Sequence, residues 1–260
     1  MTDILLSAFL LSVVLLGIHS FFGIEIIKRG IIFTDLAIGQ MAALGAAVCI
    51  LFLHGKWIYP VSLGFALLAG LAIAIASRKI KNLEAFIGLL YAFGLSGVFI
   101  FLSKSYHGME EFQRLMASDI LFTPIHEIFR TAVVYSALGL FLFFFYRRIK
   151  GSLKDIIFFI TFAVTVTSSV KLAGVLIVFA LLVGPAYISI KLFRQKHLMA
   201  AWLIGTAINL IAIFISYKMD LPTGYTIVFF QSMAAVLVSI FFPKEKSFHN
   251  EEEEIQEVDV

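Results

Sequence analysis

The chain has 260 residues, of which 61% are hydrophobic and only 14% are charged, and its mean hydropathy is +1.00. A soluble domain of this length would carry far more polar surface, so the composition predicts an all-α polytopic membrane protein. The alternating ten-residue segments of a membrane β-barrel are absent. The single cysteine, Cys49, excludes an intramolecular disulfide.

Nine apolar segments follow one another along the chain, and most approach the roughly twenty residues that a helix needs to cross a bilayer. The first has no basic residue before it and no small-residue cleavage site, so we interpret it as a retained helix. The segments are residues 4–27, 31–53, 61–77, 83–102, 128–146, 156–167, 172–190, 199–217 and 225–242. They predict eight or nine transmembrane helices.

The sixth and seventh segments are the least certain part of this pattern. Residues 156–167 are too short to span a bilayer with margin, and the polar residues 168–171 follow them. Residues 156–190 therefore form either two full spans or a broken helix, which is tolerated only where protein or water surrounds it. The sequence Gly184-Pro185-Ala186 further predicts that the seventh helix ends there and bends into a short basic surface segment.

The basic residues of the connections predict the orientation. Fourteen of the 20 Lys and Arg residues fall on the same side as Lys28 and Arg29, and six fall on the other. The positive-inside rule then places the N-terminus outside and the C-terminus in the cytoplasm. Residues 1–243 form the predicted transmembrane domain, and residues 244–260 form an acidic tail that we expect to be disordered.

Ionisable and amide side chains inside predicted spans are costly, so each is a candidate functional residue. They are His19, Glu25, Asp35, Gln40, Glu84, Lys171, Asn209 and Gln231. Glu25 can form a local ion pair with the basic residues that follow it. Glu84 can cap a helix N-terminus, and Lys171 can reach the outer surface.

Three of these residues are candidates for lining a substrate pathway. Counted from Arg29, Asp35 lies roughly 9 Å into the membrane and Gln40 near its middle, within a run of small residues. The two lie about 140° apart around a helix, so they do not form one chelating face. His19 can face the same cavity from the first helix. The alternatives are a structural pair or a helix cap for Asp35, an interhelical hydrogen bond for Gln40 and a packing hydrogen bond for His19.

No sequence motif indicates chemistry on a substrate. The chain lacks a phosphate-binding glycine loop, a zinc-protease motif, a supported catalytic triad and a cysteine cluster. We therefore expect that it is not an enzyme and binds no cofactor itself, and that any use of ATP takes place on another chain.

Three stretches together resemble the permease subunits of ABC transporters that import zinc, manganese or iron. They are residues 173–186 (AGVLIVFALLVGPA), 216–228 (SYKMDLPTGYTIV) and 87–97 (IGLLYAFGLSG). The resemblance implies a type II ABC importer-like permease in a bacterial inner membrane, working as a dimer of permease copies. It also implies a separate ATPase subunit that uses ATP and an extracytoplasmic solute-binding protein, with no role for nucleic acid.

The resemblance fails at one position of the second helix. The family usually has an Asp and a His there that are proposed to line the metal route. Here Gln40 stands at the His position, and Asp35 lies one residue before the Asp position. A neutral amide is a poorer ligand than imidazole for zinc or manganese. The cargo is then a metal ion, a metal chelate or another solute, and the metal-ligating residues stay unknown.

The family also implies a contact with the ATPase after the Pro-Ala pair. In this chain the contact falls on residues 187–197, and Tyr187, Lys191, Arg194 and Lys196 are the residues expected to make it. The alternative is an ordinary basic loop on the cytoplasmic side. For the whole protein, two other functions stay open: an ion-coupled secondary transporter that uses Asp35 and His19, and a membrane scaffold or sensor.

Overall fold

The computed structural model describes residues 2–105, 110, 112, 120–146 and 148–242. Within these residues all regular structure is helical, and nine helices are long and apolar enough to span a membrane. The elements are α1 (Thr2–Lys28), α2 (Thr34–Leu53), α3 (Ile58–Ala76), α4 (Leu83–Leu102), the 3₁₀ turn η1 (Ile120–Phe122), α6 (Ile125–Phe141), the π-helical turn η2 (Leu142–Tyr146), α7 (Ser152–Ala173), α8 (Val175–Leu192), α9 (His197–Met219) and α10 (Thr223–Phe241). The all-α polytopic fold is confirmed, and the predicted tail, residues 244–260, lies outside the described residues.

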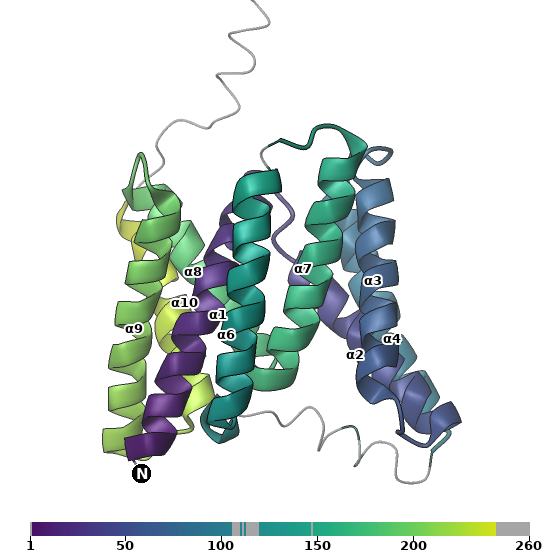
Figure 1. Cartoon of the computed structure of the whole chain (residues 1–260), viewed down its shortest axis with the longest axis horizontal. Helices are drawn as coiled ribbons and strands as arrows, with labels where there is room; N and C mark the ends of the chain where they lie inside the picture. The colour runs from purple at the N-terminus through teal and green to yellow at the C-terminus, as the bar shows by residue number, and fades with distance from the viewer. Residues whose placement is uncertain (1, 106–109, 111, 113–119, 147, 243–260) are drawn as a thin grey trace, which may run out of the picture.

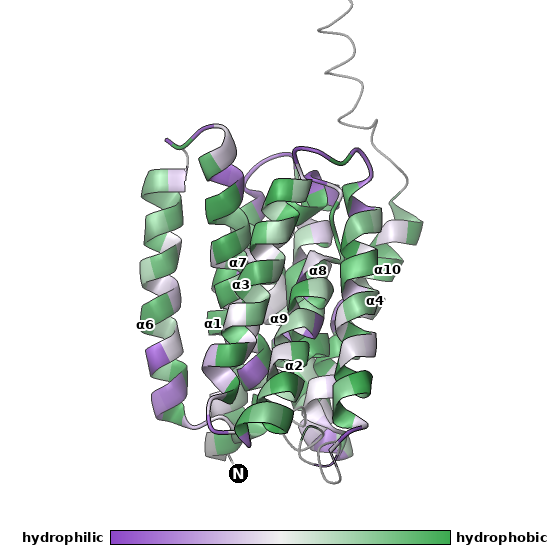
Figure 2. Cartoon of the chain, turned by 90° about the vertical axis from the view of Figure 1, so that its right-hand side faces the viewer, coloured by the Kyte–Doolittle hydropathy of each residue, from purple (hydrophilic) through white to green (hydrophobic). Residues whose placement is uncertain are grey.

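The helices form two neighbouring groups (Figure 1). In one group α2 packs on α3 and α4, and α7 packs on α3 and α2; in the other, α1, α8, α9 and α10 pack together with α6 against α1. Contacts of α8 with α7 and α2 join the two groups. Figure 2 shows hydrophilic residues gathered in the connections at the two ends of the bundle, with apolar helices between them.

The sixth and seventh predicted segments are two full helices, not one broken helix. The helix α7 extends over 22 residues and includes the polar positions 168–171, which the sequence pattern placed between spans. Thr167 and Ser168 are compatible with a membrane helix because their hydroxyl groups donate hydrogen bonds to carbonyl oxygens one turn earlier in α7. The chain breaks at Gly174, whose φ of 85° is unfavourable for other residues, and α8 begins at Val175.

The predicted break at Gly184-Pro185 is wrong. The helix α8 continues through both residues to Leu192, and only four residues separate it from α9. Instead of bending the chain, these residues permit close packing. Gly184 lies against Gln231 of α10, and the ring of Pro185 lies where a side chain at Gly205 of α9 would be.

The second helix begins three residues later than predicted. Residues 29–33 form a turn in which Gly30 has a φ of 65°, and α2 starts at Thr34. Asp35 therefore lies in the first turn of α2, at one end of the bundle. The depth of roughly 9 Å that was counted from Arg29 is an overestimate, because the count assumed a helix through this turn.

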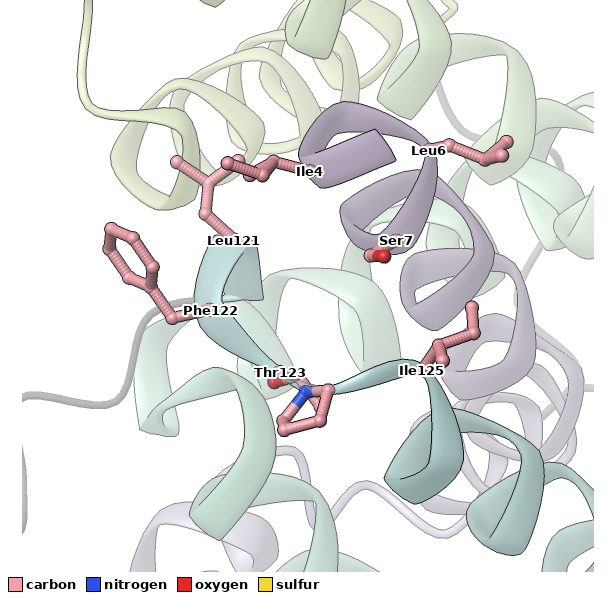
Figure 3. Close-up of a pocket in the computed structure, with 8 residues that line it drawn as sticks. Ile4, Leu6, Ser7, Leu121, Phe122, Thr123 and Ile125 are labelled. Atoms are coloured by element: carbon pink, nitrogen blue, oxygen red, sulfur yellow. The ribbon is translucent and has the colours of Figure 1, made fainter. Parts of the chain in front are cut away.

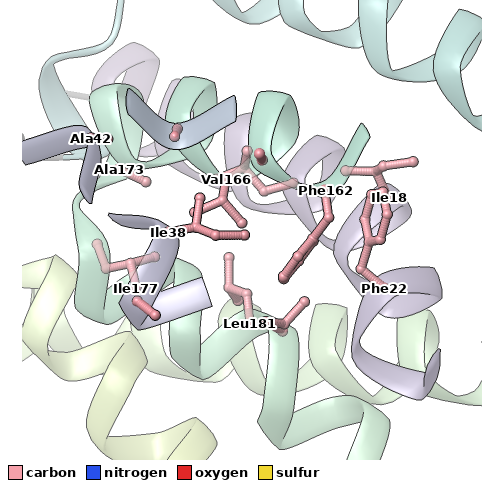
Figure 4. Close-up of a cluster of buried hydrophobic side chains, with 14 of the residues drawn as sticks. Ile18, Phe22, Ile38, Ala42, Phe162, Val166, Ala173, Ile177 and Leu181 are labelled. Carbon is pink, nitrogen blue, oxygen red and sulfur yellow. The ribbon is translucent and has the colours of Figure 1, made fainter. Parts of the chain in front are cut away.

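Buried aromatic and aliphatic side chains fill the space between the two helix groups (Figure 4). Phe22 of α1 meets Phe162 of α7 with ring centroids 4.9 Å apart. Ile38 of α2, Val166 of α7 and Leu181 of α8 point into the same cluster. The cluster thus joins α1 and α8 of one group to α2 and α7 of the other.

Glycine residues let pairs of helices touch through their backbones. A Cβ at Gly23 of α1 would lie 2.0 Å from the carbonyl oxygen of Leu182 in α8, and a Cβ at Gly70 of α3 would lie 2.8 Å from that of Phe159 in α7. No side chain fits at such distances without moving the partner backbone. Small residues have this role in membrane helices generally, because lipid leaves little hydrophobic driving force for helix association.

An ion-pair network ties the helix groups at the end that carries most of the basic residues. Arg29 donates to Asp155 of α7 at 3.0 Å and to the hydroxyl group of Tyr146 at 2.9 Å, and its guanidinium lies 4.3 Å from the ring centre of Phe158. Arg78, from the α3–α4 turn, lies 3.6 Å from the second oxygen of Asp155. Asp155 thus links the end of α1 to the end of α3 through α7.

We expect Gly23→Ala to lower the thermal stability of the purified protein. The added methyl group must displace α8 from α1, and overpacking of this kind costs about 1–3 kcal/mol. Gly88→Ala is the control, because a Cβ at Gly88 meets nothing within 4 Å and alanine is the better helix former. Melting temperatures in detergent measure both variants, and equal melting temperatures would contradict the close contact.

Asp155→Asn should also destabilise the protein, by on the order of 1–3 kcal/mol, because two arginine side chains lose their charged acceptor. Asp220→Asn, at the exposed C-terminal cap of α9, removes the same charge at the opposite end of the bundle and should have little effect. Thermal unfolding compares the two variants. A stronger effect at Asp220 than at Asp155 would show that the network does not hold the helices.

Candidate functional site

Asp35 is a buried acid without a cationic partner among the described residues. The residue is 1% exposed, and its carboxylate oxygens make no well-aligned hydrogen bond, although the backbone N–H groups of Asp35 and Leu36 at the start of α2 lie near them. It lies on the same helical face as Ile38 and Ala42, which point toward α7 and α8. A buried carboxyl group is costly inside a membrane protein, so Asp35 remains a candidate functional residue.

Gln40 lies on the other side of α2 and is half-buried. Gly94 of α4 packs directly on its backbone, since a Cβ there would lie 3.0 Å from the carbonyl carbon of Gln40. The structure therefore places Gln40 beside α4 and Asp35 on the face toward α7 and α8. This agrees with the expectation that the two residues do not form one chelating face.

Glu84 contributes to the start of α2, a position that the sequence pattern did not indicate. Its Oε1 atom accepts the backbone N–H of Phe33 at 3.3 Å, so it caps α2 from the first turn of α4. Its second oxygen is buried without a hydrogen bond among the described residues. Two acids, Asp35 and Glu84, thus stand near the positive end of the α2 dipole.

His19 lies in a different environment, between α1, α6 and α7. Its Nδ1 atom donates to the carbonyl oxygen of Leu15 at 2.8 Å, which leaves the buried Nε2 atom without a partner. The nearest aromatic ring is Tyr135 of α6, with ring centroids 6.5 Å apart. The hydroxyl group of Tyr135 in turn contacts those of Ser168 and Ser169 in α7 at 2.7 and 2.6 Å. The sequence pattern did not indicate this polar cluster, because its residues lie far apart along the chain.

Asn209 and Gln231 form a second buried polar contact, between α9 and α10. The Nε2 atom of Gln231 donates to Asn209 Oδ1 at 2.8 Å and to the carbonyl oxygen of Gly205 at 3.0 Å. Both side chains are fully buried, so this pair acts as an interhelical hydrogen bond within the membrane.

The residues expected to meet an ATPase lie at the basic end of the bundle. Tyr187 and Lys191 belong to the last turns of α8, and Arg194 and Lys196 belong to the exposed four-residue turn that follows. Tyr187 contacts Ser239 of α10 through their hydroxyl groups at 3.0 Å, and Lys191 donates to Tyr187 at 3.5 Å. The four residues thus lie within one stretch, residues 187–196, formed by the end of α8 and the turn that leads to α9.

A shallow apolar pocket of about 550 Å³ lies at the opposite end of the bundle (Figure 3). It is lined by the start of α1, by η1 and by the start of α6: Ile4, Leu6, Ser7, Leu121, Phe122, Thr123, Pro124 and Ile125. Its few polar groups do not suit an ion. Among the described residues, no three His, Cys, Asp or Glu side chains come together to hold a metal ion.

The sequence and the fold both match known transporter proteins. Residues 148–242 match the ABC 3 transport family. The chain is 23% identical to a protein of Haemophilus influenzae named "Probable iron transport system membrane protein", over 93% of this chain and 91% of that one. It is 21% identical to the manganese transport system membrane protein MntC of Listeria innocua, over 90% and 89% of the two chains.

A solved structure shares the fold over almost the whole chain. PsaBC from Streptococcus pneumoniae, in complex with Fab, superposes with a TM-score of 0.72 at 18% identity, covering 93% of this chain and 92% of that chain. The family match, the two full-length relatives and the nine-helix fold agree with one another. Over nearly its whole length this chain is therefore similar to membrane proteins of metal transport systems, and residues 148–242 match the ABC 3 transport family.

Proposed function

We propose that this chain is the membrane permease of a bacterial ATP-driven importer whose cargo is a divalent metal ion, such as zinc, manganese or iron, or a metal chelate. The relatives named for iron and manganese transport support the cargo class. The observation that carries the proposal is Asp35, a buried acid without a cationic partner among the described residues, at the start of a small-residue helix. An acid in this position can bind a cation in passage.

In the proposed route Asp35 and Gln40 act from α2, and His19 acts from α1. The carboxylate of Asp35 offers charge, and the bare Nε2 atom of His19 offers a metal ligand whose tautomer is fixed by Leu15. Their helices do not present these groups to one another as a single cluster. A cation would therefore meet them in succession and would be held weakly enough at each to leave, as conduction requires.

The energy is proposed to come from ATP on a separate ATPase subunit, since this chain carries no nucleotide-binding motif. Tyr187, Lys191, Arg194 and Lys196 are proposed to meet that subunit in the cytoplasm. Alternating access would follow, with two permease copies forming the pathway and an extracytoplasmic binding protein delivering the cargo. The excess of Lys and Arg at this end supports its cytoplasmic orientation.

The direct experiment is uptake into proteoliposomes that contain this chain together with an ATPase subunit that co-purifies with it. We expect uptake of manganese, iron or zinc that requires ATP and the binding protein. Uptake that follows a proton or sodium gradient without ATP would instead identify a secondary transporter. The absence of uptake for all three metals and their chelates would reject the proposed cargo.

Asp35→Asn should lower metal uptake at least about tenfold while assembly with the ATPase is retained, because the amide keeps the shape and removes the charge. Glu84→Gln is the matched control, because glutamine keeps the oxygen that caps Phe33. Uptake in proteoliposomes is measured together with co-purification of the ATPase. Normal uptake by Asp35→Asn would remove Asp35 from the route.

Changing Arg194 and Lys196 together to Glu should abolish most of the stimulation of the ATPase by the permease, with a melting temperature close to that of the parent. Both side chains are in an exposed turn, so the loss should act on the contact and not on the fold. Lys56→Glu with Lys218→Glu makes the same charge change at the opposite end. Unchanged ATPase stimulation in the first variant would exclude this turn from the contact.

A further inference from the structure

A basic patch lies where α1 and α8 end side by side. It consists of Lys191 in the last turn of α8 and of Arg194 and Lys196 in the exposed α8–α9 turn. The helices α1 and α8 touch where a Cβ at Gly23 would lie 2.9 Å from that of Ala186, and both run toward this end of the bundle. Lys28 of α1 lies at the same level as Lys191 but points to the opposite side of the helix pair, because five residues turn each side chain about 140° from the contact.

The C-terminal end of α10 lies beside the basic patch. The Tyr187–Ser239 contact joins α10 to α8 one turn before Lys191. The last described residue, Phe242, comes three positions after Ser239. The chain therefore leaves the bundle next to the surface proposed to meet the ATPase.

Beyond Phe242, a connection that carries Lys244 and Lys246 leads to an acidic segment. The acidic segment, residues 251–259 (EEEEIQEVD), contains six carboxylates and no basic residue. Only eight residues, 243–250, separate it from Phe242. An extended chain covers at most about 3.3–3.6 Å per residue, so eight residues reach roughly 26–29 Å, which is ample to return to the neighbouring turn.

We infer that the acidic segment binds the basic patch of its own chain and covers the surface that the ATPase would use. The inference rests on the proposed function for its consequence, but the binding itself follows from charge and position. A short tether gives an effective concentration in the millimolar range, so weak ion pairs suffice. Because the pairs are exposed, salt should loosen them. The ATPase would then compete with the acidic segment for the patch.

Disulfide cross-linking tests the contact without any ATPase. In a Cys49→Ser background, Gln195→Cys in the exposed turn and Ile255→Cys in the acidic segment add two thiols and leave every charge in place. We expect mild oxidation of the full chain in nanodiscs to join them within one chain. The yield should exceed that of the control pair Asn82→Cys with Ile255→Cys at least about fivefold, because Asn82 lies in the α3–α4 turn of the other helix group.

The contribution of charge to the contact is tested with the same cysteine pair, at positions 195 and 255. Changing Glu251, Glu252, Glu253 and Glu254 to Gln, or raising the salt to 1 M, should reduce the Gln195→Cys yield to that of the control. Equal cross-linking yields for the two pairs would overturn the inference. A yield that changes neither with the glutamine substitutions nor with salt would also overturn it. A cross-link between two chains would also overturn it, because the occupant would then be a second copy. Size-exclusion profiles verify that each variant remains folded.

ATPase stimulation separates this inference from the proposed function. The chain with four glutamines should stimulate the ATPase at least about twofold more than the parent at low salt, with the difference lost at high salt. If the cross-link is salt-sensitive but the chain never stimulates an ATPase, the contact between the acidic segment and the basic patch is supported and the proposed function is rejected. Normal stimulation that is unaffected by the glutamines would overturn the competition.

Discussion

Contact between helix backbones at glycine is the constraint on which this bundle depends. Lipid is as apolar as the helix surfaces, so close packing must supply what the hydrophobic effect supplies in water. Gly23 brings α1 onto the Leu182 carbonyl group of α8, and Gly205 brings α9 onto Pro185 of the same helix. The position of α8 is thereby fixed from two sides. Lys191, in the last turn of α8, is consequently positioned by helix packing in the membrane interior.

Apolar length alone was enough to predict the nine spans, but not where two of them meet. The pattern treated residues 168–171 as a break because hydroxyl side chains lower the local hydropathy. In the structure those hydroxyls bond within α7 and to Tyr135, so they are compatible with a buried helix. Proline was similarly misleading, because a membrane helix can continue through Pro185 when its neighbours pack around the ring. The break is at Gly174, where the backbone itself requires glycine.

The candidate site could also be predicted only in part from the sequence. The sequence identifies Asp35, Gln40 and His19 by chemistry, and helical spacing correctly separates the faces of Asp35 and Gln40. It does not say which helices surround them, because that depends on contacts between residues far apart in the chain. His19 meets Tyr135 across 116 positions, and Glu84 caps Phe33 across 51. A single sequence holds no local signal for either contact.

Two acids of this fold, Asp155 and Asp35, have different surroundings. At the basic end Asp155 is matched by Arg29 and Arg78, so its charge is compensated and its role is to hold helices. Asp35, in contrast, is buried without a cationic partner among the described residues, and the donors near its carboxylate are backbone N–H groups in the first turn of α2. In the proposed route this acid would meet a cation in passage. With an amide at Gln40 in place of imidazole, the α2 part of the proposed route offers only oxygen ligands, which suit manganese better than zinc. The departure from the family pattern at Gln40 therefore bears on the proposed cargo.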